Sequence, residues 1–400
     1  MRCLREGMVP AVLLGDLNML RCFARSKIPT IVANSDPRQP ALHSRHAGAR
    51  KVIAPFDDTE RVLSDLEAIA RPYAARPTLF YGNDRQLLTV SRHRERLQRS
   101  YRLRLPPPEL VEKLVDKSRF GALSRELGLP VPPTLSSSEF ETAEDVMDGI
   151  AGPWLVKPNV HESWTELRAE EGRGPTKALR ASTAVELRRL LTGVRRHTND
   201  FVVQAFVAGS EAQVYGYHAY LDANRNTLGH FVGRKIRTYP REAGASTYVE
   251  LVEEPAVTRL GAEIVQKLGI VGPVKVDFKR DARSGTFHLL ELNARYNLWH
   301  YLGGVCGVNL PLIAHAELTG QDPPPARTHR TDVRWLSFAD DLRSFLRSYL
   351  PSGEVGVAAW LASLRGPKIY DVFAWNDPLP FCVGLLNHTR ALRHRLRGAR

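Results

Sequence analysis

Oxygen-bearing side chains alternate with apolar ones along VKVDFKRDARSGTFHLLELNAR, the stretch from residue 274 to residue 295. Successive side chains of a strand point to opposite faces, so Asp277 would leave the core face, as would Glu291 and Asn293 further along. We expect a hairpin whose register pairs Asp277 with Glu291 and leaves Ala282–Thr286 as a five-residue connection. Three oxygen donors would then converge on one patch of the sheet.

Two carboxylates this close repel each other unless a cation lies between them. Asp, Glu and Asn are hard oxygen ligands that suit Mg²⁺ or Mn²⁺, and such ions also hold substrate phosphates. On the second strand, Leu290 and Leu292 would point to the core. The alternative interpretation is an exposed amphipathic hairpin on which Lys275 and Lys279 neutralise the acids.

Two lysines upstream lie in positions that suit a phosphate group. Lys117 belongs to residues 109–128, whose apolar spacing predicts one helix that ends at Gly128. Lys157 ends the apolar strand PWLVKP, beside a glycine-containing loop at residues 160–176. A lysine at such a place acts as a point charge on phosphate, although surface lysines are common in any protein.

The elements that would position these residues follow from the apolar runs. In the first hundred residues, PAVLLG, PTIVAN, KVIAP and PTLFYGND read as strands separated by helical patterns. This alternation predicts a parallel sheet with crossover helices. No GxGxxG follows the first strand, so dinucleotide binding is not supported. Proline-rich segments then divide the chain, and we expect three parts, residues 1–105, 106–325 and 326–400.

Composition narrows the classes of protein. The chain has 400 residues and a formal net charge of +13, which favours a polyanionic partner such as nucleotide phosphates, nucleic acid or an anionic membrane. No run approaches about 18 uninterrupted apolar residues, so no membrane span is expected. The four cysteines are scattered and form no CxxC, which fits a reducing, cytoplasmic location.

The order of these motifs resembles the ATP-grasp superfamily. DK on a helix is followed by VKP on a strand, a glycine-containing loop, QAFVAGSE, a basic RK segment and finally D…ELNAR. The resemblance covers about residues 114–320 and is closest to the carboxylate–amine ligase branch, which includes D-aspartate ligase-like and D-alanine–D-alanine ligase-like enzymes. It implies an α/β (α+β) ATP-grasp fold with an N-terminal parallel-sheet domain, an ATP site between two lobes of residues 106–325, and a small C-terminal extension.

The resemblance also implies which residues bind ATP. Lys117 and Lys157 match the two lysines that hold the phosphates, and Glu211 matches the acid that accepts the ribose hydroxyls. The backbone that would meet the adenine edge comes from Gln204, Ala205, Phe206 and Val207. Lys235 belongs to a basic segment that links the nucleotide and substrate sites in this family, and in a strand it would face away from Arg234.

For the metal and the reacting groups, the resemblance points back to the hairpin. Asp277, Glu291 and Asn293 match the magnesium ligands that bridge the ATP phosphates. Arg295 matches an arginine near the reacting carboxyl and phosphoryl groups, and Lys275 lies where such enzymes place a cation for the acyl intermediate. The loop at 160–176 is expected to close over ATP, but it is longer and more acidic than the family's usual small-residue loop.

The reaction implied is ATP-dependent ligation of a carboxylate to an amine through an acyl phosphate, with release of ADP and phosphate. One alternative is a D-aspartate-type cell-wall ligase. Another is a non-catalytic module that binds nucleic acid or an anionic membrane, against which the retained acidic ligands argue. We expect small-molecule carboxylate and amine partners, no nucleic acid, and at most a weak membrane contact through the basic tail RALRHRLRGAR. Trp299 and His300 would form either a packed helix start or a substrate-pocket wall.

Overall fold

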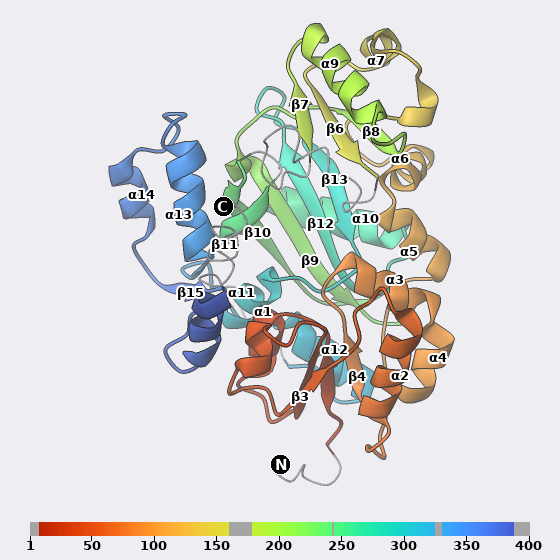
Figure 1. The fold of residues 1–400 in the computed structure, drawn as a ribbon, viewed down its shortest axis with the longest axis vertical. Coiled ribbons are helices and arrows are strands. Elements are labelled where there is room, and N and C mark those ends of the chain that lie inside the picture. The colour runs from red at the N-terminus through yellow and green to blue at the C-terminus, as the bar shows by residue number, and fades with distance from the viewer. Residues whose placement is uncertain (1–7, 160–177, 242–243, 325–329, 388–400) are drawn as a thin grey trace, which may run out of the picture.

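The structure is a computed structural model that describes residues 8–159, 178–241, 244–324 and 330–387. Figure 1 shows the N-terminal elements at the bottom, a small lobe at the top and a large sheet between them. The predicted basic tail and the loop at 160–176 lie outside the described residues. Within the described ranges, no helix is both long and apolar enough to cross a bilayer.

The N-terminal part contains the predicted parallel sheet, with the strand order β3–β2–β1–β4. Its strands are β1 (Ala11–Leu13), β2 (Thr30–Asn34), β3 (Ala49–Val52) and β4 (Thr78–Phe80). Its helices are α1 (Leu17–Phe23), η1 (Pro40–His43), α2 (Thr59–Ala70), α3 (Asp84–Arg92) and α4 (Arg94–Ser100). The central strands β1 and β2 are buried except at Asn34, the last residue of β2, because helices cover both faces of a parallel sheet.

The small lobe has an antiparallel sheet with the order β5–β8–β6–β7. Its strands are β5 (Thr134–Ser136), β6 (Trp154–Pro158), β7 (Leu179–Ala181) and β8 (Phe201–Ala205). The helical elements are η2 (Ser137–Glu139), α7 (Ala143–Gly149) and α9 (Ala184–Arg195). Helix α9 buries Leu187, Leu191 and Val194, which recur at helical spacing, and the lobe has a core of its own.

The large sheet has seven strands in the order β13–β12–β9–β10–β11–β14–β15. They are β9 (Val214–Leu221), β10 (Thr227–Tyr239), β11 (Ala245–Leu251), β12 (Gly272–Arg280), β13 (Phe287–Asn293), β14 (Arg334–Leu336) and β15 (Lys368–Tyr370). The helical elements around it are η4 (Glu211–Gln213), α10 (Pro255–Lys267), α11 (Trp299–Val305), α12 (Leu310–Thr319), α13 (Phe338–Ser344), the π-turn η5 (Phe345–Tyr349) and α14 (Val357–Ser363). Apolar cores continue from this sheet into the N-terminal part.

The single helix predicted over residues 109–128 is wrong. The structure has two helices, α5 (Pro108–Val115) and α6 (Lys117–Glu126), separated at Asp116. Asp116 is extended, and its carboxylate accepts a hydrogen bond from the Arg119 amide at 2.9 Å, which makes it the N-cap of α6. A short acidic side chain that caps a new helix therefore interrupts the apolar period. Lys117 becomes the first residue of α6.

The hairpin of β12 and β13 has the predicted register, with Asp277 opposite Glu291. A β-bulge follows, because Phe278 pairs with Leu289 and leaves Leu290 as the extra residue. Leu289 is fully buried in the core, whereas Leu290 lines a cavity. The expectation that Leu290 points to the core is therefore wrong, and the connection at 281–286 is one residue longer than expected.

Candidate functional site

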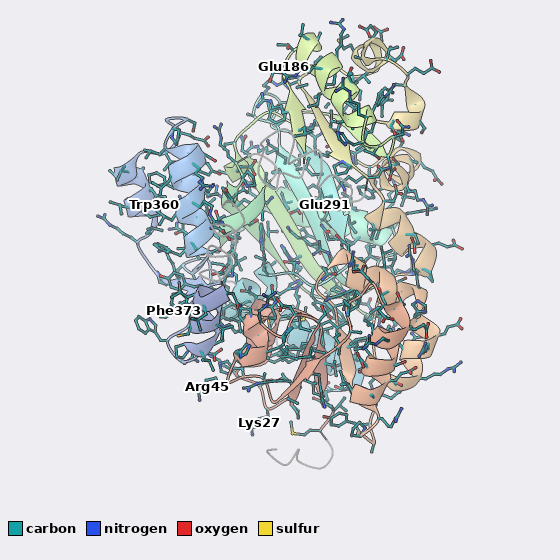
Figure 2. The ribbon with its side chains drawn as sticks, viewed as in Figure 1. Lys27, Arg45, Glu186, Glu291, Trp360 and Phe373 are labelled. Atoms are coloured by element: carbon teal, nitrogen blue, oxygen red, sulfur yellow. The ribbon has the colours of Figure 1, made fainter. Side chains whose placement is uncertain are left out.

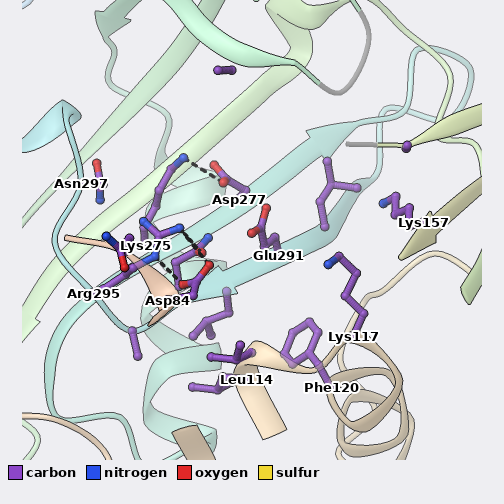
Figure 3. A pocket seen from close by; sticks show the side chains of 18 of the residues that line it. Asp84, Leu114, Lys117, Phe120, Lys157, Lys275, Asp277, Glu291, Arg295 and Asn297 are labelled. Atoms are coloured by element: carbon purple, nitrogen blue, oxygen red, sulfur yellow. Dashed lines mark hydrogen bonds and ion pairs between the residues drawn. The ribbon is translucent and has the colours of Figure 1, made fainter. Parts of the chain in front are cut away.

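A cavity of about 1020 Å³ lies where the N-terminal part, the small lobe and the large sheet meet (Figure 3). Every predicted site residue lines it: Lys117, Lys157, Gln204, Ala205, Phe206, Val207, Glu211, Lys235, Lys275, Asp277, Glu291, Asn293 and Arg295. These residues come from segments that are up to 178 positions apart in the chain, between 117 and 295. The fold brings all of them together, while the role of each stays a prediction.

The two lysines predicted to bind phosphate lie on the opposite side of the cavity from Asp277 and Glu291 (Figure 3). The Lys117 ammonium, on the first turn of α6, donates to the Asn159 carbonyl at 3.0 Å. The Lys157 ammonium, on β6, donates to the Gln204 side chain at 2.6 Å. Their hydrogen bonds aim two cations into the cavity from separate elements, which is an arrangement that suits a polyphosphate.

The segment from Gln204 to Val207 runs along the cavity from the end of β8. The amides of Ala205 and Phe206 donate to the carbonyls of Pro133 and Pro153, both at 2.8 Å. Because these two amides already donate hydrogen bonds, only the Val207 amide and the carbonyl groups of this segment could contact a base edge.

Cations and one buried carboxyl surround that segment. Two cations contact the Phe206 ring, with the Arg180 guanidinium at 4.2 Å and the Lys279 ammonium at 4.7 Å from its centroid. Glu211 begins η4 and is 8% exposed at the cavity wall. A buried carboxylate at a cavity wall can accept hydrogen bonds from ligand hydroxyl groups.

The hairpin presents the oxygen donors as the alternation predicts. Asp277 places Oδ2 at 2.9 Å from the Lys275 ammonium. Its other oxygen, Oδ1, is buried and has no hydrogen-bond partner among the described residues. Glu291 is the direct cross-strand neighbour of Asp277, and Asn293 follows on the same strand. A buried carboxylate oxygen without a partner is costly, so this atom fits a site that a cation completes.

The donor set suits a hard divalent ion rather than a soft one. It contains two carboxylates and one amide, and the described part of the chain contains no group of three or more His, Cys, Asp or Glu residues placed for a metal. Mg²⁺ takes few protein ligands because it keeps waters and binds substrate phosphates. The Asn293 Oδ1 atom also accepts a hydrogen bond from Arg295 at 3.0 Å. Asp277 and Glu291 would therefore be the principal ligands.

Lys275 lies between a carboxylate and an aromatic ring. Its ammonium is 4.4 Å from the centroid of Trp299 and 2.9 Å from Asp277. Burial lowers the pKa of Lys275 from its ordinary value, while the Asp277 charge opposes this change. Trp299 is 2% exposed, begins α11 and also lines the cavity. Trp299 is therefore both a packed residue at the start of a helix and part of the cavity wall, so the two interpretations do not exclude each other.

Arg295 connects the hairpin strand to the N-terminal part. Its Nε donates to Asp84 at 2.5 Å, and Nη1 reaches the Gly82 carbonyl at 3.5 Å. Burial opposes the charge, but Asp84 and the hairpin carboxylates raise the pKa of Arg295 above its ordinary value, so the guanidinium stays charged. Asp84 was not among the residues predicted from the sequence. Its signal was present in YGND, which follows β4 at the carboxyl end of a parallel sheet, where ligands commonly bind.

In the basic segment of β10, the two arginines form ion pairs within the fold, whereas the lysine lines the cavity. Arg234 forms an ion pair with Glu250 of the neighbouring strand β11, with Nε at 3.0 Å from Oε1. Arg237 is buried and makes two 2.8 Å contacts with the carboxylate of Asp341 on α13. Lys235 lines the cavity, as expected for a residue that faces away from Arg234. The two arginines thus have structural partners within the fold.

The chain is similar in sequence to proteins of known activity. A family model described as "ATP-grasp in the biosynthetic pathway with Ter operon" matches residues 225–339. The D-aspartate ligase of Enterococcus faecium is 23% identical over 343 residues, which are 82% of this chain and 80% of that protein. The chain spans less than half of the carbamoyl phosphate synthase large chains that it also matches.

Solved structures have the same fold. L-amino acid ligase from Bacillus licheniformis superimposes with a TM-score of 0.57 at 17% identity, over 80% of this chain and 77% of that one. The biotin carboxylase domain of the Hydrogenobacter thermophilus 2-oxoglutarate carboxylase, solved with MgADP, has a TM-score of 0.61 at 15% identity, over 81% and 73%. The matches confirm the resemblance drawn from the sequence and the expected α/β (α+β) fold class with its N-terminal parallel sheet.

Proposed function

We propose that this chain activates a small carboxylate as an acyl phosphate and couples it to an amine. The chain belongs to the ATP-grasp superfamily and is a ligase that forms carbon–nitrogen bonds. The observation that carries this proposal is the composition of the cavity. Two lysines face two adjacent carboxylates across it, and one carboxylate oxygen, Oδ1 of Asp277, is buried without a partner.

ATP would lie between the small lobe and the large sheet. The cavity of about 1020 Å³ is slightly larger than the range of about 300–1,000 Å³ that is common for small-molecule sites, so it has room for a nucleotide and a second reactant. Lys117 and Lys157 would hold the phosphates as point charges. Val207 and Glu211 would contact the base and the ribose, which would turn the γ-phosphate toward the hairpin.

The hairpin fits a magnesium ion by its chemistry. Asp277 and Glu291 would hold the ion, with Asn293 contributing its amide oxygen. When bound, such an ion neutralises phosphate charge and makes the γ-phosphorus more electrophilic. Manganese has similar ligand preferences and would serve in its place.

The chain's own cations would then support both halves of the reaction. Arg295, held by Asp84, would orient the substrate carboxylate toward the γ-phosphorus. One carboxylate oxygen forms a bond to phosphorus while the bond from phosphorus to ADP breaks. A neutral amine next attacks the acyl carbon, phosphate leaves with the transferred oxygen, and the amine loses a proton. Lys275 would stabilise the negative oxygen that develops on the acyl carbon.

A D-aspartate-type ligation is the second candidate, and the similarity to D-aspartate ligase over most of both chains favours it. It makes D-amino acids with acidic side chains the first carboxylates to try. A non-catalytic nucleic-acid or membrane module with the same fold would have no need of the buried, unpartnered oxygen of Asp277.

A screen of ADP release across amino acids and amines tests the proposal. We expect release that requires ATP, a divalent ion, one carboxylate and one amine together. Glu291→Gln should reduce this rate at least about a hundredfold, since it removes a charge that neutralises the transition state. Glu253→Gln is the matched control, because Glu253 is exposed outside the cavity and its loss should leave the rate unchanged. ADP release that ignores the amine, or equal activity in Glu291→Gln, would contradict the proposal.

A further inference from the structure

Large apolar side chains are exposed together near the end of the described chain. We call them the C-terminal apolar surface: Trp375, Leu379, Phe381, Leu385 and Leu386. Their exposed fractions run from 42% for Phe381 to 90% for Trp375. Single exposed apolar residues are normal in soluble proteins, but five within twelve positions indicate a surface that another body covers. None of the five lines the cavity, so the surface is separate from the proposed reaction.

Polar contacts fix this segment to the N-terminal part. Asp377 is 1% exposed, and its carboxylate accepts hydrogen bonds from the Ser44 hydroxyl at 2.6 Å and the Arg45 amide at 2.9 Å. Further along, the Asn387 side chain donates to the Arg38 carbonyl at 2.9 Å. The apolar side chains are therefore presented by an anchored element.

The exposure follows the geometry of a helix. Residues 379–387 are helical, and Leu379 and Leu386 lie seven residues apart on one exposed face. Pro380, on another face, is buried. An aromatic pair extends the surface at the N-terminal end of this helix, where the ring of Phe373 lies 4.8 Å from Trp375. Figure 2 shows Phe373 at the edge of the molecule, on the same side as the labelled Arg45.

Positive charge borders the apolar face. Arg45 is exposed next to it, and Arg38 is exposed as well, where it forms an ion pair with Asp36 at 3.1 Å. The whole chain carries a formal net charge of +13, so two copies would repel each other, whereas an anionic surface would attract each copy. An exposed tryptophan with leucines beside cationic side chains is the composition that binds the headgroup region of a bilayer.

We propose that the C-terminal apolar surface docks the protein on an anionic lipid bilayer, with Trp375 and the exposed leucines inserted among the headgroups. The protein would lie on the membrane without spanning it, since apolar insertion and electrostatic attraction together give reversible binding.

Co-sedimentation of the full chain with vesicles tests this proposal. We expect the protein to bind phosphatidylcholine vesicles that contain one third phosphatidylglycerol, and not vesicles of phosphatidylcholine alone. A double variant, Trp375→Ser with Leu386→Ser, should bind the anionic vesicles at least about tenfold more weakly, because two inserted side chains are lost. Val185→Ser is the matched control, since Val185 is 72% exposed on α9 and lies outside this surface.

Two further measurements distinguish a loss of lipid binding from misfolding and from self-association. The thermal midpoint of the double variant should match that of the wild type, because both substituted side chains are exposed. Light scattering without lipid should give a monomer for both proteins. A failure of the wild type to bind anionic vesicles, or equal binding by the double variant, would overturn the proposal. A dimer that the double variant abolishes would also overturn it, since the surface would then contact a second copy.

Discussion

Asp277→Asn should destabilise the protein even without nucleotide or metal, because Asp277 is the charge partner of a buried lysine. The Lys275 ammonium lies 2.9 Å from Asp277 Oδ2, and the two side chains are 13% and 9% exposed. At that distance and an effective dielectric constant of about 20, the gross attraction is about 6 kcal/mol. Desolvation cancels part of it, and breaking a buried pair from one side costs about 3–5 kcal/mol.

The lower end of that range is the expected value, about 3 kcal/mol, for two reasons. Lys275 keeps its contact with the Trp299 ring, which is worth about 0.5–2 kcal/mol. Burial also lowers the pKa of Lys275, so the ammonium can release its proton once its partner is gone. A second change, Lys275→Met, removes the stranded cation, and the double variant should recover at least about half of the loss.

Urea denaturation of the wild type, both single variants and the double variant measures this coupling in the free energy of unfolding. Asp332→Asn is the control, because the ion pair of Asp332 with Arg330 is exposed and should contribute little to the free energy of unfolding. An Asp277→Asn protein within about 1 kcal/mol of the wild type, or single effects that simply add in the double variant, would refute the reasoning.

Three other outcomes are expected. Asp341→Asn should cost about 3–5 kcal/mol of unfolding free energy in denaturation experiments, because Asp341 is fully buried and pairs with Arg237. Burial lowers the pKa of His315 to about 4, so below about pH 6.5 this residue binds more protons in the unfolded chain than in the folded one. Its contribution should lower stability by up to about 1.4 kcal/mol per pH unit as the pH drops from there toward 4. His315→Gln should remove this contribution and make the slope in thermal scans shallower, while His218 and His300, whose pKa values burial also lowers, keep theirs. Asp84→Asn should lower ADP release about tenfold while leaving MgADP affinity in calorimetry unchanged, because it frees Arg295 without touching the phosphate ligands.

The sequence predicted those features that depend on local periodicity. Alternation along 274–295 was enough to place Asp277 opposite Glu291, because a register slip would turn the apolar side chains to the wrong face. The bulge at Leu290 was not predicted, because two adjacent leucines, Leu289 and Leu290, do not show by themselves which of them is buried.

Features that depend on contacts between distant parts of the chain were largely invisible in the sequence. The apolar period across residues 109–128 favoured one continuous helix, whereas the structure begins a new helix after Asp116, whose side chain caps it. The partnership of Asp84 with Arg295 joins positions 211 residues apart and needs the finished fold. The same holds for Arg237 and Asp341, whose pairing through the C-terminal helices showed that this arginine is structural.

Oxygen transfer from the carboxylate substrate to phosphate is the most direct test of the proposed reaction. Once the screen identifies a substrate pair, the carboxylate is labelled with oxygen-18, and the released phosphate is analysed by mass spectrometry or phosphorus NMR. An acyl phosphate predicts that each phosphate released carries one oxygen atom from the substrate carboxylate. Phosphate that contains only unlabelled oxygen, at a rate of amide formation equal to ADP release, would contradict it.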